Sequence, residues 1–385
     1  MIPYGKQIID EDDIEAVVNV LRSDYLTQGP EVPKFENAVS QYCNVSYGVA
    51  FNSATSALHA ACHALGVGLG DIVWTTPITF VASANCARYC GATVDFVDID
   101  PTSYNISPEK MAKKLEEAAY INRLPKVVIP VHFTGHPADM KAIHELSKKY
   151  GFSIIEDASH AIGASYQNSK VGSCKYSDIT IFSFHPVKII TTGEGGLALT
   201  NSNDMTEKMR SFRSHGITRD VALLGDKGQG AWYYEQQSLG YNYRMTELQA
   251  ALGSSQLKKL DHWIDLRHKV AQKYDESLAA LPLVLPIHSS DSISSLHLYV
   301  VQVDGKKTSL TRRQVFDQMR ALGVGVNVHY IPVHLQPDYR RLGFSNGDYP
   351  ASELYYSQAI SLPMYANLSD SSQCKVIESL SVILK

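Results

Sequence analysis

The sequence has few cysteines and no cysteine pattern that would bind a metal. Its 385 residues include six cysteines, and a chain of this size needs no disulfide framework to stabilise its core. Cys86 and Cys90 are four residues apart in an apolar helical pattern, whereas zinc sites usually show CxxC pairs with further ligands. We therefore expect structural thiols and no metal site.

The sequence also lacks clustered charge and long apolar runs. The net charge is -4, from 35 basic and 39 acidic residues, and no segment concentrates Lys and Arg, which argues against a nucleic-acid partner. No apolar run approaches the roughly 20 residues that span a bilayer, and the first 13 residues do not resemble a signal peptide. We expect a cytoplasmic protein without a membrane partner. With 44% hydrophobic and 19% charged residues, global disorder is excluded.

Short apolar runs alternate with amphipathic segments from about residue 47 to residue 215, a pattern typical of βαβ units. The runs are too continuous for strands with one exposed face, so both faces should be covered by helices. We predict up to seven strands in one mostly parallel sheet, at 47–51, 72–76, 93–99, 126–133, 153–157, 178–184 and 196–200, with helices that include 56–65, 81–90 and 138–150.

A helical pattern of more than 30 residues begins near residue 245 and should bend near Gly253 to Ser255. After it we predict a strand at 296–303, a helix at 311–323 and a strand at 324–330. These elements indicate a smaller α/β domain. We predict a large domain at 1–250 and a small C-terminal domain at 251–385, which includes the bridging helix.

The segment SFHPVKIITTGEGG (183–196) contains the most informative residue, Lys188, which follows a buried strand and precedes a glycine-rich turn. A partly desolvated lysine has a lowered pKa, and its neutral amine can attack an aldehyde. The plainer alternative is a lysine whose amine reaches solvent from the strand end.

Two further segments could bind parts of one ligand. In IIEDASHAIG (154–163), Asp157 ends a strand, where α/β sheets bind ligands, although a helix cap is an equally good interpretation. In FNSATSALHAA (51–61), small residues open a helix whose N-terminus favours an anion, or is simply capped. An amine, a carboxylate and an anion site together suit pyridoxal phosphate, with its aldehyde, ring nitrogen and phosphate.

The motifs above, with TTPITFVAS (75–83), GYNYRMTELQAALG (240–253) and VHYIPVHLQPDY (328–339), resemble the DegT-type nucleotide-sugar aminotransferases. The resemblance runs nearly end to end. It implies the aspartate aminotransferase-like α/β fold (PLP fold type I), pyridoxal 5'-phosphate as cofactor and pyridoxamine phosphate as an intermediate. Related enzymes that dehydrate sugars have His in place of the lysine, so Lys188 favours amination.

The resemblance also implies roles for single residues. Lys188 matches the Schiff base lysine, Asp157 the partner of the pyridine nitrogen, and His160 a residue on one face of the cofactor ring. Other cofactor contacts are implied for Phe80 on the opposite face and, at the phosphate, for Ser53, Ala54, Thr55 and Ser183. Asn242 matches an asparagine that reaches the neighbouring subunit's cofactor, which implies a homodimer with shared active sites.

For the substrates, the resemblance implies transfer of an amino group from L-glutamate to the C4 ketone of a UDP-4-keto-6-deoxy-N-acetylhexosamine, as in pseudaminic acid biosynthesis. The implied sugar contacts are Tyr4, Tyr25, Leu26, Thr27, His329 and Tyr330, while Arg213, His215 and Arg219 could meet phosphates or carboxylates or form solvated ion pairs. The alternatives are another nucleotide 4-keto sugar, such as a bacillosamine or perosamine precursor, and a non-catalytic regulatory protein that binds pyridoxal phosphate.

Overall fold

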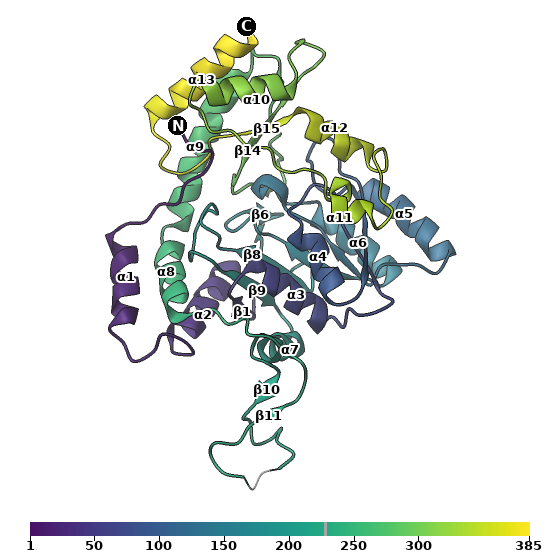
Figure 1. The fold of residues 1–385 in the computed structure, drawn as a ribbon, viewed down its shortest axis with the longest axis vertical. Coiled ribbons are helices and arrows are strands. Elements are labelled where there is room, and N and C mark those ends of the chain that lie inside the picture. Colours follow the sequence, from purple (N-terminus) through teal and green to yellow (C-terminus); the bar gives the residue numbers. More distant parts are fainter. Residues whose placement is uncertain (227–228) are drawn as a thin grey trace.

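The computed structural model describes residues 1–226 and 229–385 and contains a seven-stranded, mostly parallel sheet (Figure 1). Strand β9 alone runs antiparallel to its two neighbours. The seven predicted strands are confirmed, most of them shorter by one or more residues than predicted. In spatial order they are β1 (Tyr47–Phe51), β9 (Gly196–Thr200), β8 (Ile179–Ser183), β5 (Ser153–Asp157), β4 (Val127–Ile129), β2 (Ile72–Thr75) and β3 (Thr93–Phe96).

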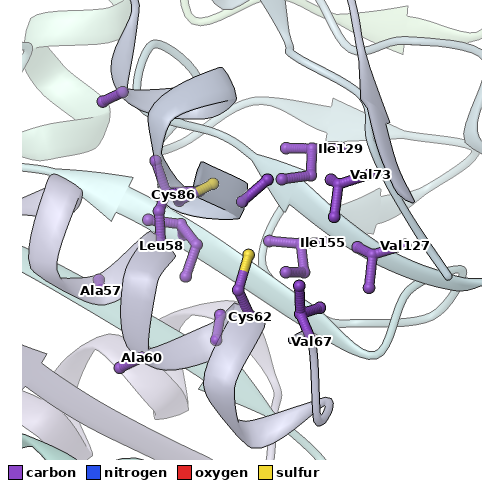
Figure 2. Packing of buried hydrophobic residues seen from close by; sticks show 14 of the residues in the cluster. Ala57, Leu58, Ala60, Cys62, Val67, Val73, Cys86, Val127, Ile129 and Ile155 are labelled. Carbon is purple, nitrogen blue, oxygen red and sulfur yellow. The ribbon is translucent and has the colours of Figure 1, made fainter. Parts of the chain in front are cut away.

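Helices cover both faces of this sheet, which explains its continuous apolar strands. Val127 and Ile155 point into one buried cluster, whereas the adjacent Val128 and Ile154 point into another on the opposite face. Figure 2 shows Cys62 and Cys86 facing the strands that carry Val127 and Ile155. The helices around the sheet are α3 (Ala54–Ala64), α4 (Ala82–Tyr89), α5 (Pro108–Tyr120), α6 (Met140–Tyr150) and α7 (Asn203–Arg213).

The cysteines are free thiols, and most are packed in the interior. Cys62 and Cys86 are fully buried, whereas Cys90 is half-buried beside the same cluster. The structural role predicted for Cys86 is confirmed by its place in the core.

Two N-terminal helices that the sequence analysis did not predict lie beside α8 (Glu247–Leu257): α1 (Glu11–Leu21) and α2 (Glu31–Cys43). Pro30, at the start of α2, supplies no capping side chain, and buried Glu247 accepts hydrogen bonds from the N–H groups of Glu31 (2.6 Å) and Val32 (3.4 Å) instead. A residue 216 positions away therefore caps the helix, which no local pattern could reveal.

The long helical segment is interrupted at a different place from the predicted one. Helix α8 ends at Leu257, and α9 (Leu260–Leu278) follows after two residues. Gly253 lies within the continuous helix α8, where its lack of a side chain allows α8 to approach α2: an added Cβ would lie 2.7 Å from the Phe35 ring. The predicted bend at 253–255 is therefore wrong.

The C-terminal region contains a three-stranded antiparallel sheet of β12 (Leu283–Val284), β14 (Tyr299–Val303) and β15 (Ala359–Leu362). The predicted strand at 324–330 is wrong, because only Val324 and Asn327 make single bridges, to Ile2 and Ser361. Residues 327–330 instead line a cavity. The helices here are α10 (Arg312–Ala321), α11 (Pro337–Arg340), α12 (Pro350–Gln358) and α13 (Asp370–Leu384). The division of the chain at residue 250 stays a prediction.

A narrow arm projects from the body beyond α7 (Figure 1). It contains a two-stranded pairing of β10 (Ile217–Thr218) with β11 (Glu235–Gln236). A second small sheet is formed by β6 (Ser165–Tyr166), β7 (Ser169–Lys170) and β13 (Ser292–Ile293), and two 3-10 turns are η1 (Phe133–Gly135) and η2 (Val333–Leu335). Within the described residues, no helix combines the length and apolar character needed to cross a membrane.

Candidate active site

A cavity of about 980 Å³ lies at the carboxyl ends of β5 and β8. Its wall combines the strand ends, the start of α3 and the segment 327–330. Eleven of the residues predicted from the sequence line it: Tyr4, Ser53, Ala54, Thr55, Phe80, Asp157, His160, Ser183, Lys188, His329 and Tyr330.

Lys188 follows β8 and projects its amine into the cavity. Its backbone N–H donates to the carbonyl of His185 (2.9 Å) in a tight turn. Within the described chain the amine makes no hydrogen bond or ion pair, and the residue is half-buried. Removal from water lowers the pKa of the amine to about 8, and the Asp157 carboxylate opposes that shift. A substantial fraction of the amine is therefore neutral near physiological pH.

Asp157 is fixed by hydrogen bonds from two sides. Its Oδ2 accepts from the hydroxyl of Ser83 (2.5 Å), which lies 2.8 Å from the hydroxyl of Thr79. Its Oδ1 accepts from the N–H of Ser159 (3.1 Å). One oxygen thus caps a local turn while the residue lines the cavity, and because the described chain has no helix between β5 and β6, the helix-cap interpretation is wrong. Ser83 was not predicted as a site residue because the sequence of its helix, α4, has only an ordinary amphipathic pattern.

The start of α3 presents N–H groups to the cavity. Ser53 caps this helix by accepting a hydrogen bond from the N–H of Ser56 (3.1 Å), while the N–H groups of Ala54 and Thr55 have no partner inside the helix. Gly196 of β9 passes so close that a Cβ there would lie 2.4 Å from the Ala54 nitrogen. The arrangement favours an anion at this helix end.

Three buried histidines surround the Lys188 amine. His160 Nε2 lies 3.1 Å from the Tyr330 hydroxyl, and His329 Nδ1 lies 2.7 Å from the Ser361 hydroxyl. Burial, with Lys188 nearby, lowers the pKa of His160 well below its usual value and that of His329 to about 3. The third histidine, His297, was not predicted as a site residue because it lies inside the apolar run 296–303 that was predicted as a strand, where it reads as core.

Four predicted residues lie outside this cavity in the single chain. Tyr25, Leu26 and Thr27 are exposed beside α8, where the Leu26 carbonyl accepts the Glu247 N–H (3.0 Å). Asn242 is exposed at the base of the arm. The structure of one chain does not bring these four residues to the other eleven, and their roles stay predictions.

Arg213 does not line the cavity and instead contacts α2 and β1. Its Nη1 donates to Glu36 (2.5 Å) and to the carbonyl of Ala50 (2.6 Å), which makes a largely buried ion pair between α7 and α2. This contact favours a structural role over substrate binding. Arg219 lies on the arm, with its guanidinium 5.8 Å from the centre of the Tyr234 ring.

Comparison with known proteins identifies the family. The family model described as the DegT/DnrJ/EryC1/StrS aminotransferase family matches residues 7–381. The chain belongs to this family. It is therefore an aminotransferase, and the family uses pyridoxal phosphate. The free amine of Lys188, the carboxylate of Asp157 and the open N–H groups at the start of α3 form a donor set that fits this cofactor.

Several relatives of this aminotransferase match over nearly their whole length. The spore coat polysaccharide biosynthesis protein SpsC of Bacillus subtilis is 38% identical over 100% of this chain and 97% of its own. The UDP-4-amino-4,6-dideoxy-N-acetyl-beta-L-altrosamine transaminase of Campylobacter jejuni is 38% identical over 96% and 94%. The structure of Helicobacter pylori PseC, an aminotransferase of pseudaminic acid biosynthesis, superposes with a TM-score of 0.90 at 33% identity, covering 100% and 99% of the chains.

Proposed function

We propose that this aminotransferase moves an amino group from L-glutamate to the C4 ketone of a UDP-4-keto-6-deoxy-N-acetylhexosamine, giving a UDP-4-amino sugar for pseudaminic acid biosynthesis. The observation that carries the proposal is the Lys188 amine, which has no partner among the described residues and a pKa of about 8, in a cavity beside Asp157. The relatives that are named for this sugar and this pathway support the choice of substrate.

In this proposal Lys188 would hold the cofactor, Asp157 its ring nitrogen, and the start of α3 together with Ser183 its phosphate. Bound there, pyridoxal phosphate supplies an electron sink for the carbon that loses a proton. Lys188 then takes and returns that proton at Nζ, because its lowered pKa lets the amine act both as base and as acid near neutral pH. Phe80 and His160 would confine the ring between them.

We further propose a homodimer in which each cavity is completed by the neighbouring subunit. No arginine is among the described residues that line the cavity, yet a UDP-sugar and glutamate are both anionic. The arm beyond α7 is exposed and carries apolar side chains such as Trp232 (74% exposed) and Leu239 (74%), which a partner could cover. Asn242 lies at its base.

Subunit mixing tests the shared site. Lys188→Ala and Asn242→Ala homodimers should both be weak, whereas a mixed dimer combines intact Lys188 and intact Asn242 in one of its two cavities. Mixing the two proteins should therefore restore activity toward half the wild-type value for each mixed dimer, while the homodimers that remain in the mixture stay weak. Absence of recovery despite proven subunit exchange would contradict the shared site.

Product analysis tests the reaction itself. The purified holoenzyme, incubated with glutamate and UDP-4-keto-6-deoxy-L-arabino-N-acetylhexosamine, should form an amino sugar that mass spectrometry and NMR identify. Borohydride reduction should attach the cofactor to the peptide that contains Lys188, and Lys188→Ala should lose both attachment and turnover. Wild-type turnover by Lys188→Ala would exclude the proposed role.

A second candidate substrate is another nucleotide 4-keto sugar. It is favoured by the equal 38% identity to SpsC, a protein of spore coat polysaccharide biosynthesis, and to the altrosamine transaminase. Measuring kcat/KM with bacillosamine and perosamine precursors alongside the proposed substrate distinguishes the candidates. The kcat/KM of the preferred substrate should exceed the others by at least about tenfold, which corresponds to one lost hydrogen bond worth about 1.4 kcal/mol.

A further inference from the structure

Arg267 of α9 is a buried guanidinium that no carboxylate neutralises among the described residues. It is only 3% exposed. Its Nη1 donates to three backbone carbonyls, those of Leu296 (3.1 Å), His297 (3.4 Å) and Met364 (3.1 Å). Burial lowers its pKa to about 10, which leaves it charged at neutral pH. A buried charge held only by carbonyls is costly, so its position calls for an explanation.

The segment that Arg267 holds is tightly constrained on its other side. Leu296 has a φ of +50°, which is uncommon for a residue with a side chain. The backbone N–H of Ser295 donates to the carbonyl of Gly135 (3.1 Å), and a Cβ at Gly135 would lie 2.6 Å from Ser295 Oγ and 3.0 Å from the His297 nitrogen. The backbone around His297 is therefore fixed between η1 and α9.

His297 turns its ring from this segment into the cavity. The ring is 4% exposed, and its centre lies 4.4 Å from the centre of the His160 ring. The hydroxyl of Ser295 in the same segment donates to the His160 carbonyl (2.8 Å). One fixed segment thus contacts both the ring and the backbone of His160.

We propose that Arg267 and His297 are positioning residues of the active site: the guanidinium fixes the 296–297 backbone so that the His297 ring supports the His160 ring. This inference rests on the proposed function, in which His160 packs against the cofactor. Neither residue is assigned a chemical step. Their contribution is to hold His160 where the ring meets the cofactor and Tyr330.

The charges around His297 agree with such a role. The titratable groups that face it are His160 after β5, Lys188 after β8, Arg267 on α9 and His329 in the segment 327–330, and all of them are basic. Burial first, and these neighbours next, lower the pKa of His297 well below its usual value. A neutral His297 ring can lie against His160 without repelling the charged amine of Lys188.

Two substitutions separate support by the ring from any use of its nitrogens. His297→Phe keeps an aromatic ring, whereas His297→Gln keeps a polar group and loses the ring. In the holoenzyme, kcat of His297→Gln should fall about 10- to 100-fold, the scale expected when a reacting group is displaced, with KM for the sugar little changed. The kcat of His297→Phe should be at least about tenfold higher than that of His297→Gln. Equal losses, or a weaker His297→Phe, would overturn the proposal.

A measurement that does not depend on turnover examines Arg267. Amide hydrogen exchange of the holoenzyme, followed by peptide mass spectrometry, should become faster at Ser295 and Leu298, whose N–H groups donate to the carbonyls of Gly135 and Thr134, in Arg267→Met than in the wild type. Unchanged exchange of this segment in Arg267→Met would overturn the link between Arg267 and His297, and if that variant does not fold, the His297 pair decides. The expected exchange in a protein that aminates no sugar would refute the proposed function alone.

Discussion

The reactivity of the Lys188 amine can be predicted in some detail from its surroundings. An exposed lysine amine with a pKa of about 10.4 is about 0.1% neutral at pH 7.5. With a pKa of about 8, Lys188 should be about one quarter neutral at that pH. Only the neutral amine attacks a carbonyl, so Lys188 should react about 200-fold faster than an unperturbed lysine at equal intrinsic nucleophilicity.

Reductive methylation of the cofactor-free protein measures this directly. Labelled formaldehyde and cyanoborohydride are added between pH 6 and 11, and peptide mass spectrometry follows the modification of Lys188 and of the exposed Lys113 in the same sample. The rate at Lys188 should rise with pH to half its maximum near pH 8. A midpoint near 10.4 would refute the reasoning, because it would mean that the site does not desolvate the amine.

The direction in which Asp157 shifts the pKa of Lys188 provides a second test. Its carboxylate raises the pKa of Lys188 against the larger effect of burial, so Asp157→Asn should move the midpoint below 8. At pH 7, where about 9% of the wild-type amine is neutral, labelling of Asp157→Asn should therefore become faster, by at most about tenfold. An upward shift would show that the Asp157 carboxylate does not raise the pKa of Lys188 in the cavity.

Three further predictions concern the supports of the site. Arg213→Met should reduce the free energy of unfolding by about 3 to 5 kcal/mol in urea titrations, because buried Glu36 loses its nearer cation and is left with Arg210 at 3.9 Å, and Glu36→Gln in the same chain should restore part of it. Ser83→Ala should lower kcat at least about tenfold with little change in KM, since the carboxylate ending β5 loses a charge-assisted hydrogen bond worth about 1.5 to 3 kcal/mol. Gly196→Ala should raise the Kd for pyridoxal phosphate in equilibrium dialysis at least about tenfold, whereas Gly305→Ala, which has open space, should not.

The main sheet could be predicted because its signal is local. A strand such as β4 is buried on both faces by α3 and α4 on one side and by α5 and α6 on the other, so each run had to be apolar throughout. The segment 324–330 is equally apolar, yet it forms only two isolated bridges. Val324 and Val326 pack in a buried cluster formed mainly by C-terminal residues, without a partner strand to complete a ladder, and sequence pattern does not distinguish these two situations.

The candidate site was predictable where a residue lies at the end of an element. Asp157 and Lys188 follow strands, and Ser53 begins a helix, so their positions in the chain imply a common edge of the sheet. His297 and Ser83 could not be found in this way, because each acts through a contact with a residue more than 70 positions away. Only the folded chain brings such pairs together.

The charges in the cavity follow from which groups the fold desolvates there. Burial keeps the pKa values of His160, His297 and His329 below the neutral range and raises that of Tyr330, so these four side chains are uncharged at pH 7. Lys188, with a pKa of about 8, is then the member of this group that exchanges a proton near neutral pH. A cavity arranged in this way suits proton transfer at one carbon, but it offers little positive charge to a diphosphate. The proposed nucleotide sugar is anionic, so its binding would depend on helix N–H groups and on cations from outside the cavity lining, which is the arrangement that the proposed shared site between two subunits would provide.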